Sequence, residues 1–241
     1  MFIQKGLLGK MIKEKVSNDD RYENLDGMRA YACIGIVAMH ILGNAKYEIS
    51  GFVFEKLIPS FTEFTYLFMI LSAFSMCCGY YEKMSTGNYD LESFYKRRYM
   101  RIWPFFALLC VLELIVDHNL NSLYECLADI TLAFGLIPNH HIGVVGVGWF
   151  LGVVFVFYMI FPFFIFLMKS KIRGWVTLAS AIMLNILCCL RFQDAIGRAN
   201  FVYSAMFFAA GGLIYKYRDC LKNRDRGCYH CGFSNCLLFQ C

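Results

Sequence analysis

Residues 25–44 read LDGMRAYACIGIVAMHILGN, an apolar run of helix length with Asp26 and Arg29 near its start and His40 near its end. Arg29 and His40 are eleven residues apart, which in a helix makes three turns plus ~20°, so both side chains share one face about 16 Å apart. Asp26 lies within ~40° of the same face. A polar stripe on an apolar helix is costly unless it faces a cavity or another helix. We therefore interpret this stripe as the floor of an active site.

The composition places this helix in a membrane. Hydrophobic residues make up 59% of the chain and charged residues only 17%, and the apolar residues fall in blocks long enough to cross ~30 Å of hydrocarbon. We therefore expect an all-α fold, a polytopic transmembrane helical bundle. The net charge is +5, and Lys and Arg stand at the edges of the apolar runs. That placement favours membrane orientation over nucleic-acid binding.

The apolar runs predict about six spans, at 28–44, 61–81, 101–116, 144–168, 175–190 and 199–215. The stretch 127–138 is short for a crossing, so we expect a re-entrant or in-plane helix there. Lys169, Lys171 and Arg173 then lie on the cytoplasmic side, together with both termini and the basic loop before residue 101. The sequence thus predicts a multi-pass protein of the plasma or inner cell membrane.

The ends of the chain differ from its middle. We expect a cytoplasmic lead-in at 1–24, a transmembrane domain at 25–217 and a cytoplasmic cysteine-rich tail at 218–241. The lead-in lacks the apolar core of a cleaved signal peptide. The tail contains Cys228-x2-Cys231, but the second pair that a zinc site normally needs is missing, so we expect no metal site.

Two motifs carry a family resemblance. YENLDGMRAYACIGIVAMH at 22–40 resembles the opening of the acyltransferase-3 family, integral-membrane O-acyltransferases of cell-surface glycans, whose first helix has an Arg-x10-His pattern that Arg29 and His40 match. The family's Arg-x-x-Arg is matched by Arg98 and Arg101, followed by Trp-Pro at 103–104. Softer similarities are LFMILSAF at 67–74 and GWFLGVVFVFYMIFP at 148–162. Family members typically have more spans, so we interpret this chain as a truncated member.

The resemblance implies an O-acyltransferase, with acetyl as the expected acyl group. The donor is cytoplasmic acyl-CoA, and the acceptor is a hydroxyl of a glycan or lipid-linked glycan in or at the bilayer. An imidazole is a suitable general base for a sugar hydroxyl, and the resemblance implies this role for His40, although direct acylation of His40 is an alternative. Arg29 completes the catalytic pair. No bound cofactor is expected.

Arg98 and Arg101 are the candidate donor-binding residues. Their three-residue spacing puts them near one another on a helix, where two guanidinium forks suit phosphates. The competing interpretation is simple cytoplasmic anchoring. Asp26 is a third candidate donor-binding residue, either because it orients Arg29 or because it caps the first helix.

Four further residues are candidates for lining a cavity: Ser72, Trp149, Tyr158 and Glu113. A serine in a helix more often bonds a nearby carbonyl, and interfacial placement is the default for Trp and Tyr. Glu113 stands out as an ionisable residue deep in a span.

Two other function classes compete with the enzyme. A non-enzymatic or degenerate membrane component of a glycan synthesis or export system would keep the spans without acyl-CoA binding. A transporter would need an inverted repeat or paired broken helices, and the sequence shows neither.

Overall fold

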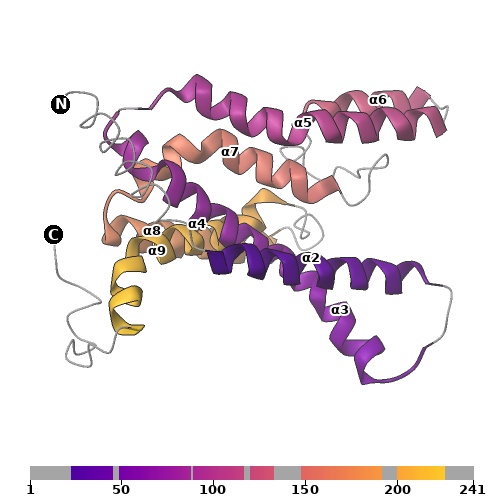
Figure 1. Ribbon diagram of the computed structural model, residues 1–241, viewed down its shortest axis with the longest axis horizontal. Helices are drawn as coiled ribbons and strands as arrows, with labels where there is room; N and C mark the ends of the chain where they lie inside the picture. Colours follow the sequence, from indigo (N-terminus) through magenta and orange to yellow (C-terminus); the bar gives the residue numbers. More distant parts are fainter. Residues whose placement is uncertain are drawn as a thin grey trace, which may run out of the picture. The chain divides into compact units, whose positions relative to one another are not determined.

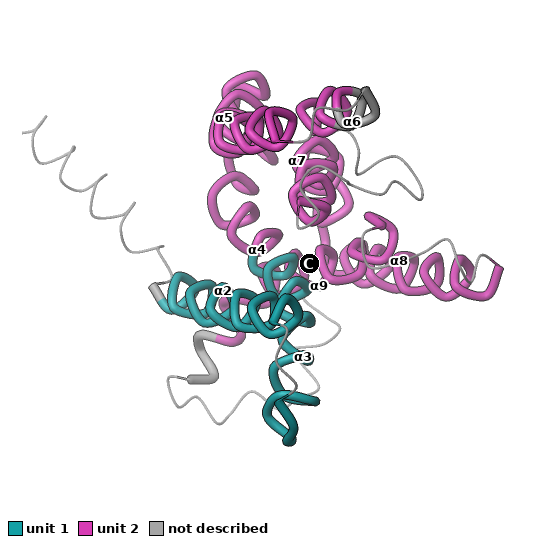
Figure 2. The backbone as a smooth tube through the Cα atoms, turned by 90° about the vertical axis from the view of Figure 1, so that its right-hand side faces the viewer, with its two compact units in different colours: residues 1–71 teal, residues 72–241 magenta. Residues whose placement is uncertain are grey.

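The computed structural model describes residues 23–45, 49–87, 89–116, 120–132, 148–191 and 200–225. Within these ranges the regular structure is helical and contains no strand, which confirms the predicted all-α class. The chain divides into two compact units, residues 1–71 and residues 72–241, coloured separately in Figure 2. Each unit is described by itself.

The first unit is built on α2 (Glu23–Asn44), which contains the Asp26-to-His40 stretch without interruption. A π-helical turn η1 (Val53–Leu57), a single turn α3 (Ile58–Ser60), a 3-10 turn η2 (Phe61–Glu63) and the start of α4 (Phe64–Ser85) follow. α2 packs against α3 and η2. Gly35 permits α2 to approach the start of α4 closely, because a Cβ there would collide with the Phe64 ring.

The turn η1 has a local cause. Gly51 has φ +126°, a conformation that favours glycine, and its N–H donates to Glu55 Oε1 at 3.2 Å. Pro59 has no N–H to donate to the preceding turn. The Ile58 N–H reaches back to the Val53 carbonyl instead, which widens this turn relative to an α-helix.

The second unit contains the rest of α4, then α5 (Leu91–Val116), α6 (Leu120–Ile130), α7 (Trp149–Leu167), α8 (Lys171–Arg191) and α9 (Phe201–Asp225), as Figure 1 shows. Its interior is aromatic. The Phe94 ring of α5 stacks on Phe161 of α7 at 5.6 Å between centroids, and Phe157 of α7 stacks on Phe208 of α9 at 4.4 Å. The α7 helix therefore lies at the centre of this unit.

The start of α5 is capped by Asp90. Its carboxylate accepts the Ser93 N–H at 2.9 Å and the Ser93 hydroxyl at 2.8 Å. These hydrogen bonds hold the pKa of Asp90 below its ordinary value. The helix thus begins ten residues before the predicted span at 101–116, and the basic run at 96–98 is helical.

The short helix α6 lies beside the second half of α5 (Figure 1). Cys126 of α6 and Cys110 of α5 are both buried, and the Trp103 indole N–H donates to the Ile130 carbonyl at 3.0 Å. Eleven residues make a helix of only about 16 Å, too short to cross a bilayer. A short non-crossing helix is thus present, although it begins at Leu120 rather than at residue 127. Residues 133–138 lie outside the described ranges.

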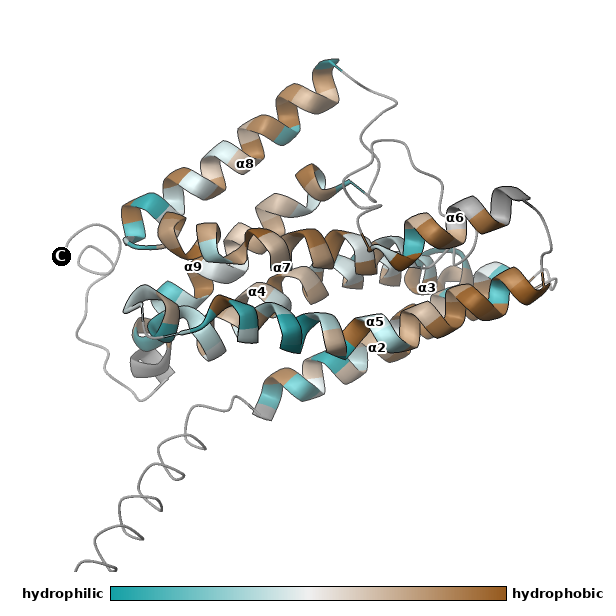
Figure 3. Cartoon of the chain, turned by 90° about the horizontal axis from the view of Figure 1, so that it is seen from above, coloured by the Kyte–Doolittle hydropathy of each residue, from teal (hydrophilic) through white to brown (hydrophobic). Residues whose placement is uncertain are grey.

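Five helical segments of the described residues are long and apolar enough to cross a membrane: Asn24–Asn44, Val53–Ser85, Leu91–Val116, Trp149–Leu167 and Lys171–Arg191. Each of them overlaps one of the first five predicted spans. Figure 3 shows α7 coloured as hydrophobic over most of its length. Residues 201–215 of the sixth predicted span, 199–215, lie in α9, which is less apolar over its full length because it continues through Lys216 and Arg218. Residues 1–22 of the predicted lead-in (1–24) and residues 226–241 of the predicted tail (218–241) lie outside the described residues, whereas residues 218–225 continue α9.

Candidate functional site

The polar stripe of α2 begins with an ion pair. Arg29 Nη1 donates to Asp26 Oδ1 at 2.8 Å, one turn apart on the helix. Because α2 already begins at Glu23, Asp26 lies inside the helix and not at its N-cap. The pair is partly exposed, so it contributes only about 0.3–0.5 kcal/mol to stability. Of the two roles expected for Asp26, this geometry supports the orientation of Arg29.

His40 lies three turns further along α2 and is half-buried. The helix is continuous between Arg29 and His40, so the shared face expected from their spacing is retained. The Asn44 amide donates to the His40 carbonyl at 2.9 Å and closes the last turn of the helix. The backbone around His40 is therefore fixed close to the end of α2.

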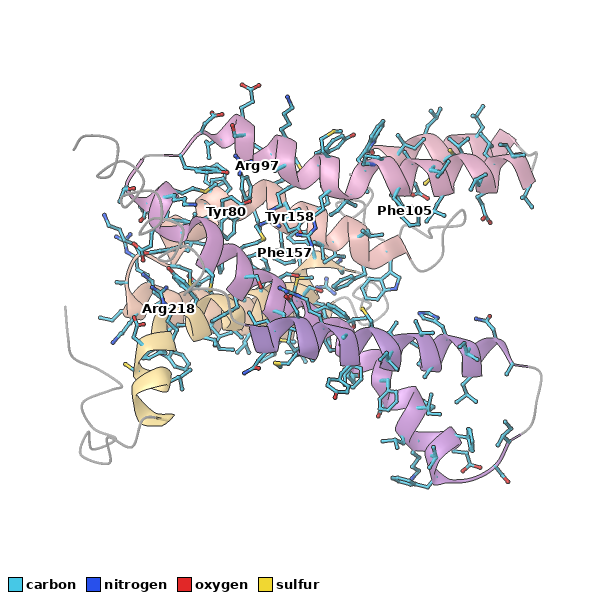
Figure 4. All side chains as sticks on the ribbon, in the orientation of Figure 1. Tyr80, Arg97, Phe105, Phe157, Tyr158 and Arg218 are labelled. Atoms are coloured by element: carbon cyan, nitrogen blue, oxygen red, sulfur yellow. The ribbon has the colours of Figure 1, made fainter. Side chains whose placement is uncertain are left out.

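Arg98 of α5 is enclosed by aromatic rings from three helices. Its guanidinium carbon lies 4.9 Å from the centroid of the Tyr80 ring on α4, 5.3 Å from Tyr158 on α7 and 5.9 Å from Phe94 on α5 itself. Figure 4 shows Tyr80 and Tyr158 in the region between these helices. Contacts of this kind are worth about 0.5–2 kcal/mol, more where water is excluded.

The same guanidinium keeps an unused donor. Arg98 Nε is buried and makes no hydrogen bond within the described part of the chain. A buried donor without an acceptor costs about 1–3 kcal/mol. The aromatic cage thus holds the cation in place without satisfying it, which is a favourable arrangement for an anionic ligand.

Arg101 has different surroundings from Arg98. It is exposed, whereas Arg98 is half-buried, although both lie on α5 one turn apart. The difference arises because a three-residue step turns the side chain by ~60° around the helix axis. Arg98 faces α4 and α7, and Arg101 faces outward.

The four candidate lining residues fall in different environments of the second unit. Tyr158 contributes to the cage around Arg98. Trp149 begins α7 and meets the Phe150 ring edge-on at 5.8 Å. Ser72 is half-buried on α4, and Glu113 is exposed in the second half of α5. Of these four residues, only Tyr158 therefore lies against a predicted donor-binding residue, which is Arg98.

Asp26, Arg29 and His40 belong to the first unit, and Arg98, Arg101 and Tyr158 belong to the second. The structure therefore describes two halves of the predicted site, each within its own unit.

The sequence analysis missed Tyr80 and a polar cluster near the end of α4. Lys216 Nζ donates to the Tyr81 hydroxyl at 2.6 Å, and that hydroxyl donates to the Met168 carbonyl at 3.2 Å. Glu82 accepts a hydrogen bond from the Tyr215 hydroxyl at 3.2 Å. The available signal was the Tyr80-Tyr81 pair directly before the basic loop, since tyrosines with cations nearby often form such contacts.

The family model for acyltransferase-3 proteins, described as an acyltransferase domain, matches residues 22–241. No curated protein and no solved structure gives a significant match. The matched range includes both α2 and the cage around Arg98.

Proposed function

This chain belongs to the acyltransferase-3 family, and from that premise we propose that it moves an acyl group, in the first place acetyl, from acyl-CoA to a hydroxyl of a cell-surface glycan or glycolipid. Acyl transfer and a multi-pass membrane fold follow from the family and from the candidate spans. The donor, the acyl group, the acceptor and the site residues are our proposal.

The donor would be held through its phosphates. CoA carries several phosphate oxygens, and a planar guanidinium binds two of them at once, with strong charge-assisted hydrogen bonds. Arg98 suits this task because its cation is fixed by Tyr80, Tyr158 and Phe94 while its Nε donor is unused. The exposed Arg101, one turn away, would add a second positive charge at the same end of the donor.

The chemical step would take place along α2. His40 would remove the proton of the acceptor hydroxyl as its oxygen attacks the thioester carbonyl. The tetrahedral intermediate then collapses, the C–S bond breaks, and CoA leaves as a thiol after taking up a proton from the histidine. Arg29, oriented by Asp26, would stabilise negative charge on the donor.

The observation that carries this proposal is the unbroken α2 helix, which keeps Arg29 and His40 on one face, three turns apart. A break between them would separate the two residues that the family pattern joins. The continuous helix provides a rigid element, on which catalytic groups are positioned more precisely than on a loop.

The test is His40→Ala in membranes that contain the protein, with labelled acetyl-CoA as the donor and incorporation into surface glycans as the readout. We expect acetyl transfer to fall at least about a hundredfold, the usual contribution of a general base. The affinity for CoA and the protein level should stay unchanged. Ile41→Ala, at the adjacent exposed position, is the matched control and should retain activity.

An alternative is a non-enzymatic membrane component. Full activity of His40→Ala would remove His40 from the mechanism, and absence of any acetyl transfer by the unmodified protein would favour this alternative. The enclosed, unsatisfied guanidinium of Arg98 favours the enzyme, because a purely structural role does not require an unused buried donor.

A further inference from the structure

The junction of α7, α8 and α9 carries a second cationic and aromatic cluster. The Trp175 indole N–H of α8 donates to the Tyr217 hydroxyl of α9 at 3.0 Å. Lys171 Nζ lies 5.2 Å from the centroid of the same Tyr217 ring. Lys171 and Trp175 are one turn apart on α8 and so share a face. An ammonium, an indole and a phenol from two helices thus meet in one place.

Close packing beside the cluster fixes its geometry. Gly174, next to Trp175, is buried, and a Cβ there would lie 2.7 Å from Leu213 Cδ2, one turn before Tyr217 on α9. The two helix backbones approach each other at this point because the glycine has no side chain. The positions of Trp175 and Tyr217 are therefore set by helix packing and not by flexible loops.

The surface around the cluster has the character of a membrane interface. Trp175 is 47% exposed, and its neighbours on α8, Ile172 and Val176, are 69% and 58% exposed. Lys171 is the first residue of the candidate span 171–191. Trp and Tyr concentrate where hydrocarbon meets the headgroups, with their apolar rings toward the lipid tails and their polar atoms toward water.

The cluster has O–H and N–H groups that are available to donate hydrogen bonds. Tyr217 accepts the indole hydrogen, so its own hydroxyl hydrogen remains available for donation. Lys171 carries three N–H donors and forms no ion pair with a carboxylate in the described ranges. An anion with several oxygens matches these donors.

We propose that Lys171, Tyr217 and Trp175 form a binding site for the phosphate of an anionic membrane lipid. The lipid phosphate would accept from the ammonium and from the tyrosine hydroxyl, and its acyl chains would cover Ile172 and Val176. The exposed apolar residues favour a lipid over a soluble anion, because a soluble phosphate would leave them in water. This site is separate from the cage around Arg98 and does not depend on the proposed reaction.

The experiment uses the full chain in uncharged detergent micelles, titrated with phosphatidylglycerol or with phosphatidylcholine and followed by native mass spectrometry. We expect a clear preference for phosphatidylglycerol. Lys171→Gln should weaken its binding about fivefold, the effect of about 1 kcal/mol for one lysine at a lipid surface. Tyr217→Phe, which removes the hydroxyl that would donate to the phosphate, should weaken phosphatidylglycerol binding several-fold.

The matched control is Arg173→Gln. Arg173 lies on the same turn of α8 but nearly opposite Lys171, and its guanidinium lies 4.8 Å from the Phe166 ring. Its replacement removes the same unit of charge and should leave phosphatidylglycerol binding close to that of the unmodified protein. Thermal unfolding in the uncharged detergent micelles checks that each variant is folded.

Three results would overturn the proposal. An equal loss of phosphatidylglycerol binding in Arg173→Gln and in Lys171→Gln would show that the lipid is attracted to the charged surface in general. Unchanged binding in both Lys171→Gln and Tyr217→Phe would place the lipid elsewhere. Displacement of phosphatidylglycerol by inorganic phosphate or by CoA at equal concentration would identify the ligand as a soluble anion.

Discussion

At the scale of one residue, the proposed role of Arg98 in donor binding depends on a side chain that is already held in place. Because the guanidinium lies against the Tyr80 and Tyr158 rings, little further conformational entropy would be lost if a phosphate bound. A lysine at this position would keep the charge but lose Nε and the planar fork. We therefore expect that a positive charge alone at this position is not sufficient for binding the donor.

We predict that Arg98→Lys weakens CoA binding about tenfold, because hydrogen bonds to a charged group contribute about 1.5–3 kcal/mol. The measurement is calorimetric titration of CoA into the detergent-solubilised protein. Arg97→Lys, at the adjacent exposed position, is the control and should bind normally. If both variants bind CoA as tightly as the unmodified protein, Arg98 is a packing residue and not a donor-binding residue.

The sequence could identify Arg98 as a candidate but not its cage. Tyr80, Arg98 and Tyr158 come from three helices, and no local pattern shows that these helices meet around one side chain. The Asp26–Arg29 pair was easier to anticipate, because partners one turn apart on a helix are visible in the spacing itself.

At the scale of elements, the segment Val53–Ser85 is too long for a simple crossing. Its 33 residues extend about 50 Å as a helix, against about 30 Å of hydrocarbon. Glu82 and Lys83 mark one end of the apolar part, so the excess lies at the start, in η1 and α3. Phe52, the residue before η1, is 70% exposed and Val53, the first residue of η1, is 46% exposed, which is unfavourable in water.

We expect this start to lie along the membrane surface, since Pro59 and the π-helical turn allow the helix to bend. Spin labels at Phe52 and Glu55 would measure depth by comparing collisions with oxygen and with a water-soluble nickel complex. The label at Phe52 should report headgroup depth, and the label at Glu55 should report water. If both labels were freely accessible from water, the segment would project straight from the bilayer.

The lengths of the elements explain where sequence reasoning fell short. The charged run at 96–98 breaks the apolar pattern, so the sequence predicts a loop at the start of α5. Tertiary contacts extend the helix instead, since Phe94 stacks on Phe161 and the Tyr95 hydroxyl donates to the Met159 carbonyl at 2.9 Å. Apolar periodicity locates membrane spans well, but it does not detect helix that is stabilised by packing beyond the hydrocarbon.

At the scale of the whole molecule, the contacts within the second unit bear on whether α9 crosses the membrane. Lys216 Nζ of α9 donates to the Tyr81 hydroxyl and, at 3.4 Å, to the Lys169 carbonyl. The end of α4, the junction of α7 with α8, and the basic part of α9 therefore lie together. Arg218 of α9, labelled in Figure 4, lies 3.9 Å from Glu82, which strengthens this grouping.

The direction of α8 bears on the path of α9. Over 21 residues α8 carries the chain about 30 Å away from this common end, to Arg191. Since Lys216 is back at the common end, a crossing by α8 implies a return crossing by α9, which is not among the five segments that length and hydropathy select. We predict that reporters fused after Ser85, Ser170 and Asp225 all report one compartment, the cytoplasm by the positive-inside rule, and that a reporter after Arg191 reports the opposite one. Alkaline phosphatase, active only after export, and β-galactosidase, active only inside, provide paired readouts at each position. A reporter after Asp225 that matched the one after Arg191 would mean that α9 does not cross, and the expected count of about six spans would then fall to the five that hydropathy alone supports.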